Sequence, residues 1–153
     1  MEIESSKDFQ TIAKLNKSVH DLHYQLYPST FKKYNYAEIK SFFKNIIEMP
    51  NFIFLLLKEE DNALGYAWAE VVEYPENPFR KSYTTIYVHQ LCVVESVRGM
   101  GYGTKLMEEI YAIGKQKKAQ KIELDYWTNN DSAHNFYKSH GFKKIREFVY
   151  LNI

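Results

Sequence analysis

Three of the six glycines, Gly99, Gly101 and Gly103, fall within five residues between a candidate strand and a candidate helix. Residues 83–94 before them are rich in Thr, Ile, Tyr and Val and form the longest predicted strand. Apolar residues then recur at helical spacing over 102–119 and predict an amphipathic helix. Because glycine tolerates positive φ, the chain can pass from this strand into this helix through a sharp turn of accessible backbone.

A turn of this kind suits a phosphate group. Its consecutive N–H groups and the positive end of the helix dipole favour an anion, while Arg98 adds a forked cation and Thr104 a hydroxyl. No G-x-x-x-x-G-K-[ST] run is present, which excludes a Walker loop. The spacing also departs from the G-x-G-x-x-G dinucleotide fingerprint, although Asp125 near the ribose-binding position leaves NAD disfavoured rather than excluded. A purely structural role for the turn stays open at this point.

Length and composition are those of a globular domain. The 153 residues, 45% apolar and 25% charged, fit one domain over 1–153. The net charge of +1 favours neither nucleic acid nor an anionic membrane, and we expect neither as a partner. The apolar run 52–57 is far shorter than the about 20 residues of a membrane helix, and residues 1–10 lack a signal-peptide pattern. The single cysteine, Cys92, fits a reducing compartment, so we expect a cytoplasmic protein.

Strands and helices are predicted along the whole chain. Ser5 or Ser6 is expected to cap the first helix, and Asn35 with Glu38 the second. Since a strand that continues through a long helix into another strand is almost always parallel to it, we predict an α/β fold with a mixed sheet. The predicted strands are 2–4, 52–57, 64–72, 83–94, 122–127 and 142–152, and the predicted helices are 6–24, 35–47, 102–119 and 131–139.

Two motifs in this order resemble the GNAT superfamily of N-acetyltransferases. Val93 is followed five residues later by Arg98-x-x-Gly101-x-Gly103, and further on stands Asn130-x-x-Ala133-x-x-Phe136-Tyr137-x-x-x-Gly141-Phe142. The resemblance implies a mostly antiparallel sheet with a parallel central strand pair, flanked by about four helices. It also implies a single acetyltransferase domain that uses acetyl-CoA and no metal.

The resemblance further implies where the cofactor would lie. The pyrophosphate of coenzyme A would sit on the backbone of the glycine turn, and its arm would pair with the main chain of the preceding strand. Asn130 would contact that arm and Tyr137 would lie close to the sulfur. The implied cofactor-binding residues are Leu91, Cys92, Val93, Arg98, Gly99, Met100, Gly101, Tyr102, Gly103, Thr104, Asn130 and Tyr137.

Acetyl transfer from a thioester to an amine requires a neutral amine, stabilisation of charge on the carbonyl oxygen and a proton for the departing thiolate. Tyr137 is the candidate proton donor, because a phenol of pKa about 10 is protonated at neutral pH. The resemblance implies that an N–H near Val93 polarises the carbonyl.

The general base is harder to assign. Many members of the family carry a glutamate on the central strand, but residues 87–90 contain no carboxylate. His89, which alternates with Tyr87 and Leu91 along the predicted strand, is the candidate base. A structural role for this histidine and a chain of waters in place of a base are the open alternatives.

Other chemistry-bearing residues receive weaker predictions. No cysteine–histidine signature surrounds Cys92, so we expect a buried thiol rather than a nucleophile. His20 and His23 lack a third ligand, and we expect no metal. Lysines at the end of the long helix complement its dipole, with contact to the 3′-phosphate of coenzyme A as the alternative. These lysines are Lys115, Lys117, Lys118 and Lys121, and the resemblance implies substrate contacts at His20, His23, Tyr24 and Tyr27.

The sequence thus predicts an N-acetyltransferase that moves an acetyl group from acetyl-CoA to a primary amine of a small molecule or peptide by direct attack in a ternary complex. A sensor or assembly module that binds acyl-CoA without turnover is the alternative, because the expected carboxylate is missing. Aromatic residues make up 16% of the chain, and this high share favours a homodimer face in addition to the core.

Overall fold

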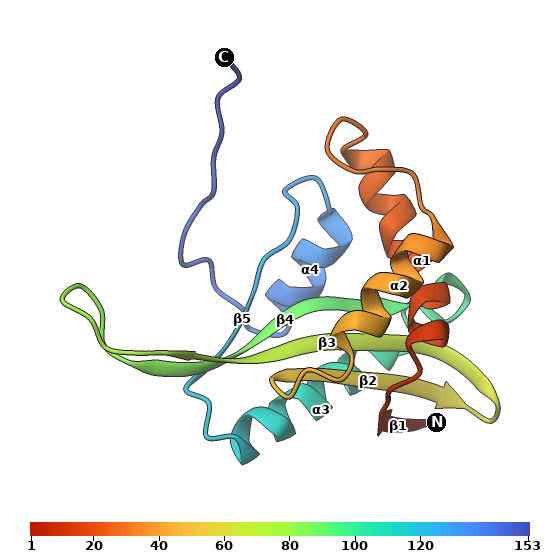
Figure 1. Ribbon diagram of the computed structural model, residues 1–153, viewed down its shortest axis with the longest axis horizontal. Coiled ribbons are helices and arrows are strands. Elements are labelled where there is room, and N and C mark those ends of the chain that lie inside the picture. The colour runs from red at the N-terminus through yellow and green to blue at the C-terminus, as the bar shows by residue number, and fades with distance from the viewer.

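The computed structural model describes all 153 residues and contains one five-stranded sheet (Figure 1). Neighbouring strands run antiparallel, except that the last two are parallel. This confirms the α/β class and the mixed, mostly antiparallel sheet. In sheet order, the strands are β1 (Glu2–Ser5), β2 (Phe52–Glu59), β3 (Asn62–Tyr74), β4 (Tyr83–Val93) and β5 (Lys121–Leu124).

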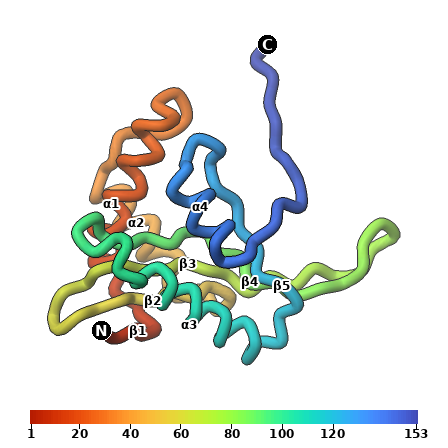
Figure 2. The backbone as a smooth tube through the Cα atoms, turned by 180° about the vertical axis from the view of Figure 1, so that it is seen from behind, coloured from red at the N-terminus to blue at the C-terminus, as the bar shows by residue number.

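Helices cover both faces of the sheet (Figures 1 and 2). On one face lie α1 (Phe9–Leu26) and α2 (Tyr36–Ile46), and on the other lie α3 (Tyr102–Gln116) and α4 (Asp131–Ser139). A 3₁₀ turn, η1 (Glu95–Val97), connects β4 to the glycine turn. None of the helices is both long enough and apolar enough to cross a membrane.

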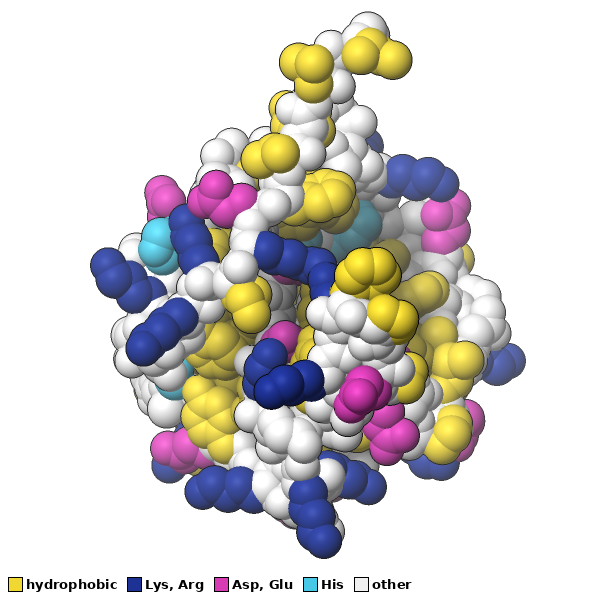
Figure 3. All heavy atoms as spheres, turned by 90° about the vertical axis from the view of Figure 1, so that its left-hand side faces the viewer, with side chains coloured by type: hydrophobic (Ala, Val, Ile, Leu, Met, Phe, Trp, Pro, Cys, Tyr) yellow, Lys and Arg dark blue, Asp and Glu magenta, His cyan; other side chains and the backbone are white.

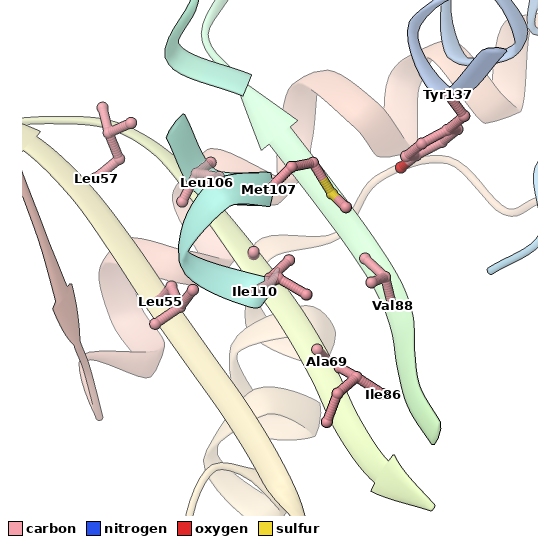
Figure 4. Packing of buried hydrophobic residues seen from close by; sticks show 10 residues of the cluster. Leu55, Leu57, Ala69, Ile86, Val88, Leu106, Met107, Ile110 and Tyr137 are labelled. Carbon is pink, nitrogen blue, oxygen red and sulfur yellow. The ribbon is translucent and has the colours of Figure 1, made fainter. Parts of the chain in front are cut away.

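Alternation along the strands divides the buried side chains into two clusters. On β2, Leu55 and Leu57 face α3, whereas Phe54 and Leu56 face α1 and α2. Successive side chains of a strand point to opposite faces, so a strand with both faces covered reads as the continuous apolar run seen in the sequence. The cluster on the α3 side contains Leu55, Leu57, Ala67, Ala69, Ile86, Val88, Leu106, Met107, Ile110 and Tyr137 (Figure 4).

Two helix starts show how local chemistry sets the element bounds. Asn35 caps α2 as predicted, because its side chain accepts a hydrogen bond from the Glu38 N–H at 3.2 Å. The predicted serine cap of α1 is wrong. Asp8 is the cap, and its side chain accepts a hydrogen bond from the Thr11 N–H at 3.0 Å. Ser6, two residues earlier, accepts a hydrogen bond from the Asp8 N–H instead.

The predicted last strand over 142–152 is also wrong. Phe142 is half-buried, but residues 143–153 are exposed, adopt no regular structure and form no backbone hydrogen bond. The sequence is rich in residues that favour strands, yet a strand requires a partner, and this segment leaves the body of the molecule beside α4 (Figures 1 and 2). We call residues 143–153 the C-terminal tail.

Candidate active site

The parallel strands β4 and β5 pair only where they begin. Residues Thr85 to Val88 pair with Lys121 to Leu124, after which β5 ends while β4 continues to Val93. Beyond Val88, the edge of β4 that faces β5 therefore has no strand partner. This opening between β4 and the chain after β5 exposes a backbone edge to which an extended ligand could add as a strand.

A β-bulge lies where the opening begins. Trp68 is paired with Gln90 and Ala69 with Val88, so His89 is an extra residue on β4. The predicted alternation of His89 with Leu91 on one face is consequently wrong. His89 stacks on Trp68 on the α1 side, with ring centroids 4.4 Å apart, whereas Leu91 packs on the α3 side.

The bulged histidine is paired with a carboxylate that the sequence analysis missed. His89 Nε2 lies 2.8 Å from Glu70 Oε2, and the other oxygen of Glu70 accepts a hydrogen bond from Asn51 at 2.7 Å. Both side chains of the pair are about three-quarters buried, with exposed fractions of 26% and 24%. A carboxylate accepts a proton and cannot give one, so Nε2 is the protonated nitrogen of a neutral His89. Nδ1, which has no partner in the chain, then carries the lone pair.

The glycine turn presents free backbone donors. Gly99 and Gly101 have φ of +79° and +85°, and Gly101 is the N-cap of α3. Five backbone N–H groups, those of Gly99, Gly101, Tyr102, Gly103 and Thr104, donate to no acceptor in the chain. They gather at the positive end of a 15-residue helix. These amides suit the diphosphate that the sequence predicted.

The two side chains predicted to assist the turn, Arg98 and Thr104, each have a contact within the chain. Arg98 is exposed, and its Nε donates to the Val93 carbonyl at 3.2 Å, which ties the turn to the end of β4. Thr104 Oγ1 lies 3.1 Å from His140 Nε2, and His140 Nδ1 lies 2.8 Å from the Phe136 carbonyl. Since Nδ1 must donate to that carbonyl, neutral His140 accepts the Thr104 proton at Nε2. The Thr104 hydroxyl is therefore committed to α4, and only its backbone N–H is free for an anion.

Tyr137 is buried on α4 and points its hydroxyl toward β4 (Figure 4). Burial raises the pKa of this phenol to about 12. Burial is the only cause of this shift, and no hydrogen bond within the chain contributes to it. Tyr126 stacks on its ring at a centroid distance of 6.0 Å. Tyr137 therefore keeps its proton at neutral pH and can donate it to an atom that enters the opening.

The side chain of Asn130 caps the N-terminus of α4. Its Oδ1 accepts a hydrogen bond from the Ala133 N–H at 3.1 Å, which is an N-cap. This bond leaves the amide nitrogen of Asn130 free, and its contact with a cofactor arm stays a prediction. The motif that suggested a ligand contact also has a local structural cause.

The predicted substrate contacts lie at the C-terminal half of α1. The Tyr27 hydroxyl accepts a hydrogen bond from the Asn129 N–H at 2.9 Å, and its ring lies 4.7 Å from that of Trp127. These contacts join α1 to the loop after β5 and wall one end of the opening. His20 Nε2 is 2.7 Å from the Lys32 carbonyl oxygen, a structural contact, and the side chain of Tyr24 is half-buried.

An aromatic cluster completes this wall. The ring centroids of His23 and Phe31 are 5.0 Å apart, and those of Phe31 and Trp127 are also 5.0 Å apart. Burial lowers the pKa of His23, so its imidazole is neutral at pH 7. The sequence analysis missed Phe31 and Trp127, because nothing in a single sequence shows that the loop after α1 returns to the loop after β5.

Two further predictions concern Cys92 and Asp125. Cys92 of β4 is buried against α1, with Sγ 3.2 Å from Ser18 Oγ, and burial raises the pKa of its thiol. Its side chain is thus a packed thiol, as predicted. Asp125 accepts a hydrogen bond from the Tyr87 hydroxyl, and burial, with help from this carboxylate, raises the pKa of Tyr87. Because Asp125 is engaged in this way, the expected ribose ligand of an NAD site is not free.

The remaining charged and metal-ligating side chains form no further site. The lysine group begins in the last turn of α3 and continues after it, at the end opposite the glycine turn, where it complements the helix dipole. No three His, Cys, Asp or Glu side chains come together in a way that could hold a metal ion.

Comparison with known proteins gives a consistent result. Residues 16–142 match the acetyltransferase (GNAT) family. N-alpha-acetyltransferase 30 from Schizosaccharomyces pombe is 29% identical over 107 residues, which cover 69% of this chain and 67% of the yeast protein. A tetramutant of the BH1408 protein from Bacillus halodurans has a TM-score of 0.94 and 27% identity over the full length of both chains.

A more distant structure shares the fold. The aminoglycoside 6′-N-acetyltransferase AAC(6′)-IG from Acinetobacter haemolyticus aligns with 100% of this chain and 98% of its own, with a TM-score of 0.75 and 15% identity. At that identity the likeness shows the architecture alone.

Proposed function

The chain belongs to the acetyltransferase (GNAT) family, and on this premise we propose that it transfers an acetyl group from acetyl-CoA directly to a primary amine. It is an N-acetyltransferase by family, and the finer proposal concerns the donor, the acceptor and the residues that act. The observation that carries it is the set of five free amides at the glycine turn, next to the unpaired edge of β4.

The residues present fit coenzyme A. The free amides of residues 99–104 would hold the diphosphate, because they cluster at the helix N-terminus without a side-chain competitor. The free edge over Leu91, Cys92 and Val93 would pair with the amide-containing arm. Acetyl-CoA supplies an activated thioester, and the exposed Arg98 and Met100 flank the entry.

Proton transfers are divided between two residues. His89 takes a proton from the amine at Nδ1, since Glu70 holds Nε2 in its protonated form. Tyr137, whose pKa is raised by burial alone, donates a hydrogen bond and then a proton to the thiolate. The two groups lie on different sides of β4, so one can serve the acceptor and the other the donor.

The acceptor is proposed as an amine of a small molecule or peptide. A peptide α-amine has the strongest support, because the yeast relative carries N-alpha-acetyltransferase in its name. The wall formed by Tyr27, Phe31 and Trp127 would contact apolar parts of such an acceptor. We further propose the cytoplasm as the location, since Cys92 is a free thiol.

The test is release of free coenzyme A thiol from acetyl-CoA with a panel of amines. The panel contains peptides with free N-termini, polyamines, free amino acids and an aminoglycoside. We expect release that depends on one class of amine and falls at least about 100-fold in kcat for Tyr137→Phe. Tyr126→Phe, which keeps the neighbouring ring, is the matched control and should retain activity.

Two outcomes would contradict the proposal. Binding of coenzyme A without release under any amine would support the non-catalytic module. Full activity of Tyr137→Phe would remove the proposed donor, while leaving the family assignment intact.

A further inference from the structure

A buried hydrogen-bond network joins α1, β3 and β4 next to the bulge. Gln90 Oε1 accepts a hydrogen bond from the Tyr66 hydroxyl at 2.6 Å and another from Asn16 Nδ2 at 3.0 Å. Asn16 Nδ2 also donates to the Tyr66 oxygen at 2.9 Å. Asn16 is 2% exposed and Tyr66 is 0% exposed. Two buried donors on two other elements therefore hold the carboxamide of Gln90.

The hydrogen-bond lengths show which end of this carboxamide faces inward. A separation of 2.6 Å is typical of O–H···O and short for N–H···O, so the atom next to the Tyr66 hydroxyl is an oxygen. Burial raises the pKa of Tyr66, which therefore keeps the proton that it donates. The observed arrangement leaves Asn16 Oδ1 as the unpaired atom of the network. The reverse arrangement would bury the amide nitrogen of Asn16 without an acceptor, and a buried N–H is the costlier group to leave unpaired.

The amide nitrogen of Gln90 points away from the network. A carboxamide is planar and carries its oxygen and nitrogen on different branches, so Nε2 is directed away from Tyr66 and Asn16. Nε2 is not one of the buried polar atoms that lack a partner, and it therefore reaches solvent. The bulge places Gln90 on the same face as His89, because His89 stacks on Trp68 while Gln90 contacts α1. Two fixed N–H donors thus lie beside the proposed base.

Charge gives little basis for choosing an acceptor on this molecule. The net charge is +1, and Figure 3 shows basic and acidic side chains interspersed over the face that is turned to the left in Figure 1. A pair of neutral N–H donors instead recognises an oxygen. The α-amine of an amino-acid amide or a peptide has a carbonyl oxygen in the same residue. The amine of a lysine side chain or of a polyamine has no such oxygen beside it.

We propose that Gln90 determines acceptor specificity by donating a hydrogen bond from Nε2 to the carbonyl oxygen beside the amine, which favours α-amines. This inference rests on the proposed acetyl transfer and names the class of acceptor. The hydrogen bond holds the acceptor by its first carbonyl group and leaves the amine beside His89. Tyr66 and Asn16 are positioning residues. Because they hold the carboxamide before the acceptor binds, little side-chain freedom is lost on binding.

The test uses leucinamide and alaninamide, each paired with an amine in which a methyl group replaces the carboxamide. Gln90→Glu keeps an oxygen toward Tyr66 and Asn16 but turns the outward donor into an acceptor. We expect kcat/KM to fall at least about 10-fold for both amides and much less for the paired amines. Each amine is compared between wild type and variant at one pH, so the pKa of the amine cancels. An effect of the new charge on His89 would change an amide and its paired amine alike.

A matched control and a second variant separate specificity from stability. Gln10→Glu adds the same charge at an exposed position of α1 and should leave all four rates unchanged. Gln90→Met keeps the length of the side chain but leaves the Tyr66 hydroxyl and the Asn16 amide unpaired. It should lower Tm, whereas Gln90→Glu should not, and both variants should lose activity selectively with the amides.

The possible outcomes distinguish this inference from the proposed function. Equal losses for the amides and their paired amines, or no loss with the amides in either variant, would overturn the role of Gln90 and leave acetyl transfer intact. Thiol release by wild type with the paired amines but not with the amides would do the same. No release by wild type with any of the four amines would contradict the proposed transfer to primary amines, and the inference would fall with it.

Discussion

At the scale of single residues, the arrangement of His89 depends on Glu70. The carboxylate holds Nε2 at 2.8 Å, is itself held by Asn51, and leaves Nδ1 as the acceptor of the imidazole. Stacking on Trp68 at 4.4 Å fixes the plane of the ring. The hydrogen bond to Glu70 and the stacking on Trp68 together hold the imidazole in one orientation. A ring held in this way can act as a base that accepts a proton at Nδ1.

The first prediction concerns the tautomer of His89. In Glu70→Gln, the new amide can donate to Nε2, which moves the ring proton to Nδ1 and removes the acceptor. We expect kcat to fall about 100-fold with a much smaller change in KM, measured by steady-state kinetics. His89→Gln combined with Glu70→Gln should cost no more than His89→Gln alone. Fully additive losses would show that the two side chains act separately.

The second prediction concerns the stability contributed by neutral Tyr137. The phenol ionises near pH 10 in the unfolded chain and at about 12 in the folded one. The contribution is therefore complete below pH 10 and is lost as the pH rises toward 12, by roughly 2 to 3 kcal/mol in the free energy of unfolding. Urea unfolding of wild type and Tyr137→Phe should show this difference growing between pH 9 and 11. Parallel losses in both proteins would contradict it.

At the scale of elements, the glycine turn combines two separate requirements. Gly101 has φ of +85°, and a Cβ built there meets no atom of the chain within 4 Å. Gly103, in contrast, brings α3 against α4, because a Cβ there would lie 3.2 Å from the Phe136 ring. One glycine allows the backbone conformation and opens space in front of the free amides, whereas the other allows close packing.

The third prediction separates cofactor binding from strain. Gly101→Val should lower stability by about 1 to 2 kcal/mol through its positive φ, and should weaken coenzyme A binding at least about 100-fold by filling the space before the amides. Thermal unfolding and calorimetric titration measure the two effects. Gly141→Val, at φ of +82° with an equally open Cβ position, is the matched control for strain. Equal losses of affinity in both variants would contradict the proposed anion site.

Local chemistry made some elements predictable from sequence and left others hidden. The Asn35 cap and the glycine turn depend on a few neighbouring residues, and the structure confirms both. The bulge at His89 depends instead on the register of β4 against β3, which no local pattern sets. Glu70 was missed for the same reason, since it reaches His89 only across that register. The tail has the local pattern of a strand, but no strand of the chain pairs with it.

At the scale of the whole molecule, the opening results from unequal strand lengths. β4 has 11 residues and β5 has 4, so the sheet is complete at one end and divided at the other. Helix α1 reaches the loop after β5 through Tyr27, and α3 begins at the end of β4. The aromatic wall, the free amides and Tyr137 thus come from three separate elements around one gap, which exists only in the folded chain.

The last prediction follows from that dependence on folding. A ligand that binds only the native state stabilises it by about 2.7 kcal/mol at one hundred times its Kd, which corresponds to roughly 5 to 10 °C in Tm for a chain of this size. We expect coenzyme A to give this shift in a thermal unfolding assay, and equal concentrations of ATP or NAD to give much less, because neither carries an arm that can pair with β4. Arg98→Ala should reduce the shift and change the Tm of the free protein only slightly, since its one hydrogen bond, to the Val93 carbonyl, is exposed. A shift as large with ATP as with coenzyme A would mean that the turn binds phosphate alone and that the β4 edge takes no part.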